Sequence, residues 1–107
     1  MSPENRVAIV LTTIGADADA LALARTLVEE QLAACVNILP PMRSIFRWDG
    51  RIDDEREQQL LIKTSPARLE ALKSRLLALH PYETPELLVL EALASDAYLA
   101  WLEESVS

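Results

Sequence analysis

The chain opens with a continuous run of apolar, largely β-branched residues at positions 7–11. Such a run is typical of a strand that is covered on both faces, so we expect it at the centre of a sheet. A helix should follow, capped by Asp17 or Asp19. The apolar positions of this helix recur with helical spacing at Leu21, Ala24, Leu27 and Val28.

Positions 33–64 predict a long hairpin whose two arms meet at an Asp49-Gly50 turn, a pair that favours a tight two-residue connection. The proline pair at positions 40–41 predicts a bulge or an edge position in the first arm, because proline cannot donate to a ladder. Arms of roughly 14 residues would reach about 45 Å, so the tip must extend beyond its own domain.

Two aromatic residues, Phe46 and Trp48, alternate on one face of the first arm. Leaving them in water would forgo burial of apolar area worth roughly 25 cal/mol per Å². We therefore infer that another subunit covers them, with Trp48 as an anchor of that interface. The acidic run at positions 53–57 has no glycine turn and no regular ligand spacing, which favours a solvated strand face over a calcium loop.

A second helix is predicted with Ser65 as its cap, Pro66 at its first position and Pro81 beyond its end. Its apolar stripe consists of Leu69, Leu72, Leu76 and Leu79. A strand at positions 87–90 and a terminal helix starting at Ser95 or Asp96 complete the chain. The order predicts one α+β domain over residues 1–107. Its fold is a ferredoxin-like split β-α-β sandwich with a long central hairpin and an extra C-terminal helix.

Charge and composition exclude several partners. The 107 residues include 10 basic and 17 acidic side chains, which give a net charge of −7. This balance repels nucleic acid and anionic lipid surfaces. No apolar stretch approaches the ~20 residues that span a bilayer, and no signal pattern opens the chain, so we expect a cytoplasmic protein. A single cysteine gives no evidence of an oxidising compartment.

Candidate chemistry lies in the stretch His80-Pro81-Tyr82-Glu83-Thr84-Pro85-Glu86, where two prolines stiffen a turn that carries the only histidine. The negative end of the preceding helix dipole would favour protonated His80 or its use as a donor. His80 is thus either a helix cap or a ligand, with Tyr82 and Glu86 beside it.

Three more positions could contribute chemistry. Cys35 sits among apolar residues, which indicates a small buried core residue rather than a ligand or redox group. Lys63 shares a strand face with Leu61 and, without a bulge, with Glu57. A surface ion pair between Lys63 and Glu57 across a neighbouring strand is as good an interpretation as a binding role.

Four motifs in order, residues 33–37, Trp48-Asp49-Gly50, Glu57 with Lys63-Thr64, and the stretch from His80 to Glu86, resemble the CutA divalent-cation-tolerance family over nearly the whole chain. The resemblance implies a homotrimer in which hairpins of neighbouring subunits pair. It also implies a non-enzymatic role in divalent-cation tolerance. Ligands would bind at clefts between subunits through Cys35, Trp48, Glu57, Lys63, Tyr82 and Glu86, with His80 as a metal ligand.

No cofactor is required by this resemblance, and copper fits poorly. Family members described as copper-binding use a cysteine near the end of the first strand and two adjacent histidines before a Pro-Tyr pair. Here Thr12 and Leu79 replace the cysteine and the first histidine, so only His80 remains. A copper site would therefore need donors from several subunits.

Three other functions remain open from the sequence. The family shares its trimeric plan with the PII signalling proteins, which suggests a small-molecule sensor. An enzyme could use Cys35 as nucleophile with His80 as base, or a Lys63 activated by burial. A scaffold could instead act through contacts with other proteins made by its acidic arm.

Overall fold

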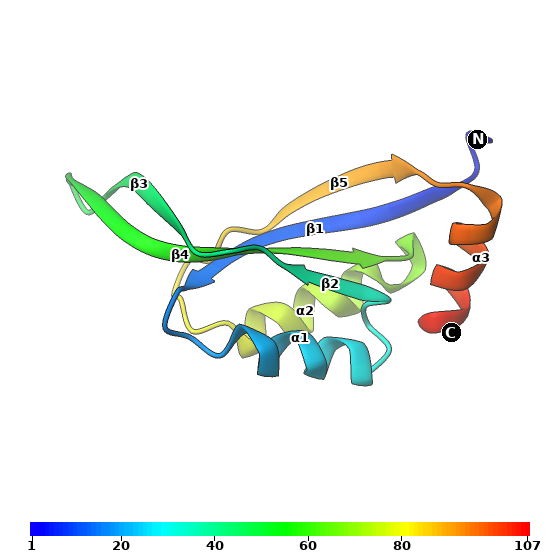
Figure 1. The fold of residues 1–107 in the computed structure, drawn as a ribbon, viewed down its shortest axis with the longest axis horizontal. Coiled ribbons are helices and arrows are strands. Elements are labelled where there is room, and N and C mark those ends of the chain that lie inside the picture. The colour runs from blue at the N-terminus through cyan, green and yellow to red at the C-terminus, as the bar shows by residue number, and fades with distance from the viewer.

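The computed structural model describes all residues from 1 to 107. Its strands are β1 (Arg6–Gly15), β2 (Cys35–Ile38), β3 (Met42–Trp48), β4 (Arg51–Thr64) and β5 (Leu88–Leu93). Its helices are α1 (Ala20–Glu29), α2 (Leu69–Leu79) and α3 (Asp96–Ser105), and a short 3-10 turn, η1 (Pro66–Arg68), leads into α2. This order, drawn in Figure 1, confirms the predicted ferredoxin-like fold with its long hairpin and extra helix.

The sheet has the order β2-β4-β1-β5, with β3 also paired to β4, and every pair is antiparallel. β1 therefore lies at the centre, as its apolar run predicts. Val10 illustrates this position, because it stands opposite Ile62 of β4 and Val89 of β5.

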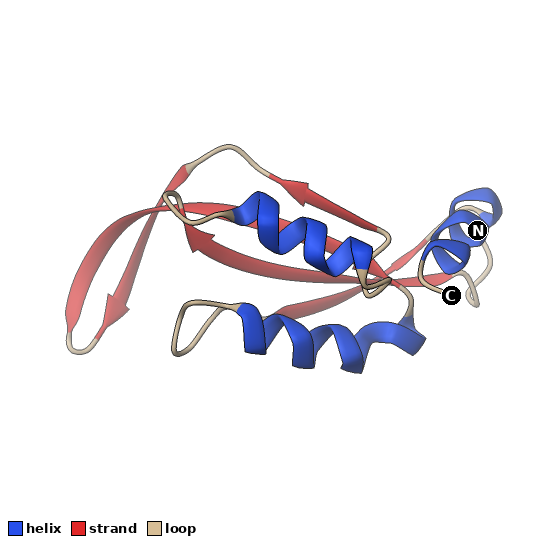
Figure 2. Cartoon of the chain, turned by 90° about the horizontal axis from the view of Figure 1, so that it is seen from below, coloured by secondary structure: helices blue, strands red, loops and turns tan.

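The helices α1 and α2 cover the same face of the sheet (Figures 1 and 2). On that face Val10, Leu60 and Ile62 are fully buried against Leu27 and Leu72. The prediction that β1 is covered on both faces is wrong within one chain. Alternate positions of β1, such as Ile9 and Leu11, face the other side and are only partly buried. The terminal helix α3 covers that side only at one end, around Val7 and Leu102.

The stripe predicted for α1 is partly wrong. Leu21 and Val28 are 62% and 41% exposed, whereas Leu23 is buried. The helix begins at Ala20, capped by Asp19, whose Oδ1 accepts the N–H of Ala22 at 3.0 Å. The inward face therefore consists of Ala20, Leu23, Ala24 and Leu27, of which the predicted stripe contains only Ala24 and Leu27.

The second helix agrees better with its sequence pattern. Leu72 and Leu76 are buried in the core, and Leu69 and Leu79 pack against it. Its first turn is the 3-10 segment η1, and the Ser65 side chain makes no capping hydrogen bond. The terminal helix is capped by Ser95, whose Oγ accepts the N–H of Tyr98 at 3.2 Å.

The hairpin of β3 and the outer half of β4 projects beyond the helices (Figure 1). Asp49 and Gly50 form its two-residue turn. Both have positive φ (51° and 78°), as a type I′ turn requires at its two central residues. β2 pairs with β4 as far as Ile38 opposite Leu60, and β3 starts with Met42 opposite Glu57. Residues 39–41 of the first arm thus face only residues 58–59 of β4, which confirms a bulge at the proline pair. β2 and β3, the two parts of the first arm, nevertheless keep the same partner strand.

Candidate functional site

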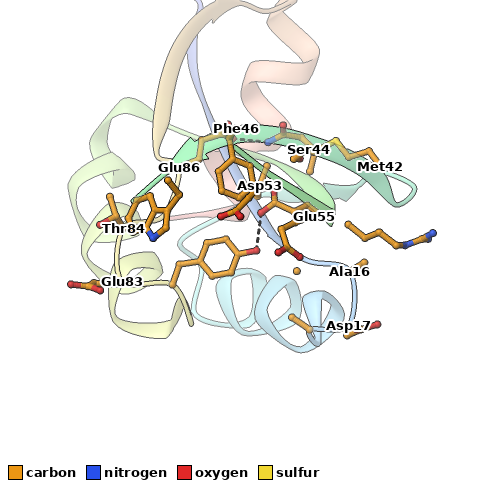
Figure 3. Close-up of a pocket in the computed structure, with 18 residues that line it drawn as sticks. Ala16, Asp17, Met42, Ser44, Phe46, Asp53, Glu55, Glu83, Thr84 and Glu86 are labelled. Atoms are coloured by element: carbon orange, nitrogen blue, oxygen red, sulfur yellow. Dashed lines mark hydrogen bonds between the residues drawn. The ribbon is translucent and has the colours of Figure 1, made fainter. Parts of the chain in front are cut away.

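A hollow of about 820 Å³ lies at the base of the hairpin. Three segments distant in sequence enclose it: the end of β1 with the turn to α1, the hairpin, and the loop between α2 and β5 (Figure 3). We call it the Tyr82 hollow. Its carboxylates are Asp17, Asp53, Glu55, Glu57, Glu83 and Glu86. Arg56 is the one basic residue that borders it, although its strand position belongs to the outer face of the hairpin.

Strand register gives the hairpin two unlike faces. Phe46 stands opposite Asp53, and Ser44 opposite Glu55, so aromatic and acidic side chains share the face that lines the hollow. The other face carries Arg43, Ile45 and Arg47 of β3 together with Ile52, Asp54 and Arg56 of β4. Arg43 forms an ion pair with Asp54 on this second face. The hairpin is therefore acidic towards the hollow and basic away from it.

His80 fastens the loop beneath the hollow to the sheet. It follows the last residue of α2 and is 7% exposed. Its Nε2 donates to the carbonyl oxygen of Thr13 at 2.8 Å, and its Nδ1 accepts the N–H of Tyr82 at 3.0 Å. This arrangement needs the neutral ring, so the donor role is as predicted and the protonated form is not what the geometry favours. Both ring nitrogens are engaged within the chain.

Tyr82 and Glu57 form the polar centre of the hollow. The Tyr82 hydroxyl donates to Oε2 of Glu57 at 2.7 Å, and Glu57 is only 6% exposed. Burial raises the pKa of Tyr82 above its ordinary 10.0, as do the hydrogen bond to Glu57 and the charges of Glu57 and Glu55. Tyr82 is thus held neutral beside an acidic cluster.

Gln59 is a member of the hollow that sequence reasoning missed. Its Nε2 donates to the carbonyl oxygen of Thr12 at 2.8 Å and to Oε2 of Glu86 at 2.9 Å. Gln59 therefore holds the Glu86 carboxylate in a fixed position at the wall of the hollow. The signal was present in the alternation that places Glu57 and Gln59 on the same strand face.

The remaining predicted positions lie elsewhere. Cys35 is half-buried rather than in the core, because it starts the edge strand β2, and its Sγ is 3.9 Å from Oδ1 of Asn37. It stands opposite Lys63, a basic neighbour that the sequence alone does not reveal. The ion pair between Lys63 and Glu57 is absent; Glu57 receives the Tyr82 hydroxyl instead. The structure therefore brings Trp48, Glu57, Tyr82 and Glu86 together, with His80 beneath them, and leaves Cys35 and Lys63 apart.

A copper ion does not fit the residues of one chain. The Thr12 side chain is fully buried on the face of β1 that packs against Leu60, and its hydroxyl has no hydrogen-bond partner. Leu79 has no atom that can bind a metal, and both ring nitrogens of His80 are already hydrogen-bonded. No three His, Cys, Asp or Glu side chains are grouped so that they could hold a metal ion.

Comparison with known proteins decides the family. Residues 8–105 match the model of the CutA1 divalent ion tolerance protein family. This chain belongs to that family. A CutA relative, the divalent-cation tolerance protein of Thermus thermophilus, is 45% identical over 98 residues, which cover 91% of this chain and 95% of the relative. The solved Thermus structure covers 94% of this chain and 99% of its own, with a TM-score of 0.87 and 43% identity.

Two further CutA structures are informative. One, from Nostoc sp. PCC 7120, is described as a PII-like protein in apo form; it is 36% identical, has a TM-score of 0.87, and covers 94% of this chain and 97% of its own. The other, from Archaeoglobus fulgidus, is described as periplasmic; it is 29% identical, has a TM-score of 0.88, and covers 94% of this chain and 99% of its own. In this chain, no helix has both the length and the apolar character needed to cross a membrane.

Proposed function

We propose that this CutA chain is the subunit of a non-enzymatic homotrimer that binds a small ligand in the Tyr82 hollow, where subunits meet, in support of divalent-cation tolerance. The observation that carries the proposal is the hollow itself. It is a large concave site with a nearly buried carboxylate, Glu57, and it lies beside the half-exposed aromatic side chains of Phe46 and Trp48.

Assembly is supported by apolar surface that one chain leaves uncovered. The side chains of Ile45, Ile52, Leu88 and Leu90 are each more than half exposed. In addition, β2 and β5 are edge strands, each with one side unpaired. A closed ring of subunits would cover both the apolar side chains and the edges. The number three comes from the family resemblance.

The distance between the candidate nucleophile and the candidate base supports a non-enzymatic role. Cys35 stands opposite Lys63 of β4, which in turn stands opposite Ile9 of β1. His80 is hydrogen-bonded to Thr13, four residues further along β1. Four residues of strand span about 13 Å, which is far beyond hydrogen-bond reach. Both His80 nitrogens are also committed to backbone groups. Neither group is placed to activate the other.

A small-molecule sensor is the second candidate, favoured by the PII-like description of the Nostoc relative. In this reading a ligand in the hollow would change the position of the hairpin, because β3 and β4 form one wall. The predictions of no nucleic-acid or membrane partner, a cytoplasmic location and a protein-binding acidic arm stay predictions.

The test combines assembly with ligand binding. Sedimentation velocity should give the mass of three chains at micromolar concentration. Trp101→Phe leaves Trp48, in the hollow wall, as the only tryptophan. Its fluorescence should respond saturably to at least one member of a panel of small amines, carboxylic acids, sugars and nucleotides. A monomer, or a Trp48 signal that no member of the panel changes, would contradict the proposal.

A further inference from the structure

Resting on the proposed function, we infer the class of ligand: the Tyr82 hollow takes a small organic cation, an ammonium or guanidinium group carried on an apolar body. The inference combines three observations about the hollow. They are its uncompensated negative charge, the scattered placement of its carboxylates, and the aromatic side chains on one wall.

Charge is the first argument. Of the six carboxylates that line the hollow, only Asp53 forms an ion pair, with Arg51 at 3.2 Å. Arg56, the one basic residue that borders the hollow, forms an ion pair with none of them, so six carboxylates face a single unpaired guanidinium group. Glu57 is more than nine-tenths buried, has no cationic partner in the chain, and uses only Oε2 in a hydrogen bond. A buried carboxylate without a positive partner is costly, so a cation that reaches the free oxygen of Glu57 would be bound favourably.

The spacing of the carboxylates argues against a bare metal ion. A calcium or magnesium ion needs several oxygens that converge to within about 2.0–2.6 Å of one point. The acidic residues come instead from the turn after β1, from the hairpin and from the loop before β5, and no three of them are grouped closely enough to hold a metal. The labelled carboxylates in Figure 3 lie around the hollow rather than at one centre. A volume of about 820 Å³ suits an organic molecule better.

The aromatic wall supplies the apolar contact. In the single chain Phe46 and Trp48 are 37% and 47% exposed, and they share the hairpin face with Asp53 and Glu55; in the proposed assembly this face borders the cleft between subunits. Aromatic faces attract ammonium and guanidinium groups, most strongly where water is excluded. Carboxylates beside exposed aromatic rings favour a cation with an organic body over either an anion or a neutral sugar.

One competitor has the same chemistry. The outer face of the hairpin on a second copy carries Arg47, which makes no ion pair in its own chain, and Arg43, which is already paired with Asp54. If a neighbouring Arg47 fills the hollow in the assembled protein, a free organic cation cannot enter. The experiment therefore uses the assembled protein.

The experiment titrates the assembled Trp101→Phe protein with benzylamine, benzyl alcohol and benzoate, which share one ring and differ in charge. We expect benzylamine alone to change Trp48 fluorescence saturably, with one site per subunit and weaker binding in 1 M NaCl. Glu57→Gln should weaken benzylamine roughly tenfold, since one charge-assisted contact is lost. Glu55→Gln, at an exposed position on the same face, should weaken it less and leaves the Tyr82 contact intact.

The matched control is Glu103→Gln, which removes the same charge from an exposed position on α3 and should leave the affinity unchanged. Equal loss in Glu103→Gln and Glu57→Gln would overturn the inference, because overall charge would then explain binding. Saturable binding of benzoate or benzyl alcohol without benzylamine would also overturn it, while leaving the proposed ligand-binding function in place. If none of the three probes changes the signal, the organic-cation class is wrong and the wider panel decides the proposed function.

Discussion

Two threonines in the same sheet provide a sharp test of the packing described above. Thr12 of β1 and Thr64 of β4 are both fully buried on the face that α1 and α2 cover. The Thr64 hydroxyl donates to the carbonyl oxygen of Leu32 at 2.7 Å, whereas the Thr12 hydroxyl has no partner. Replacing each by valine keeps the volume and the branching and removes only the hydroxyl, so the two substitutions should have opposite effects.

The magnitudes follow from the hydrogen bonds. A buried hydroxyl without a partner costs about 1–3 kcal/mol, so Thr12→Val should raise the free energy of unfolding by about 1–2 kcal/mol. Thr64→Val loses a hydrogen bond and leaves the Leu32 carbonyl oxygen without that donor, so stability should fall by about 1–3 kcal/mol. The two variants should therefore differ by roughly 2–5 kcal/mol, which is large for a change of one atom type.

Urea unfolding followed by circular dichroism measures both variants, at one protein concentration because assembly contributes to stability. The slope of the transition should stay constant, so that shifts of the midpoint report stability alone. If Thr12→Val is no more stable than the wild type, the Thr12 hydroxyl has a partner in solution and the description of this part of the core is wrong. Equal shifts in the two variants would lead to the same conclusion.

Four further outcomes are expected. In the proposed homotrimer, where a neighbouring subunit covers Trp48, Trp48→Glu should weaken the assembly by several kcal/mol, because it would put an unpaired charge at a buried contact. A dilute Trp48→Glu protein that light scattering still finds as a trimer would contradict this. Because the pKa of Tyr82 is raised by folding, its stabilising contribution is complete below pH 10 and is lost as the pH rises further. As the pH rises above 10, Tyr82→Phe should therefore lose less stability than the wild type does. Stability curves that fall in parallel with pH for the two proteins would show that folding does not raise the pKa of Tyr82. Gly50→Ala should cost about 1 kcal/mol through its φ of 78° alone, since the added methyl group meets no atom within 4 Å, and thermal unfolding would show it. Calorimetric titration with Cu²⁺ should find no tight site within one chain, and a saturable site lost in His80→Ala would mean that subunits share donors.

The fold was predictable where local chemistry and periodicity agree. The Asp49-Gly50 turn and the stripe of α2 depend on nearby residues, so the pattern was sufficient for both. The stripe of α1 was harder, because its small residues leave two adjacent faces almost equally apolar. Cys35 was misplaced because the neighbouring alanines are buried and the edge position of β2 depends on strand order. Sequence spacing carries no information about which strand lies outermost.

The hollow was predictable only in part. Tyr82 and Glu86 were selected from a stiffened turn, and Glu57 from a strand face, but their convergence requires the register of β1 with β4. Gln59 was missed because an uncharged amide draws no attention by its chemistry, although strand alternation places it on the same face as Glu57. His80 was chosen for its metal chemistry, and the structure uses it as a clamp between two backbone groups. That role depends on contacts with residues far away in the sequence.

The bulge at the proline pair makes the hairpin a separable module. The pairing of β2 with β4 is fixed by the core, and the pairing of β3 with β4 by the two-residue turn; the two registers differ by one residue, which the bulge absorbs. The outer hairpin can therefore diverge without disturbing the register of the domain beneath it. Relatives could exchange these arms as units, and under the proposed assembly the arms rather than the cores would determine which chains can combine.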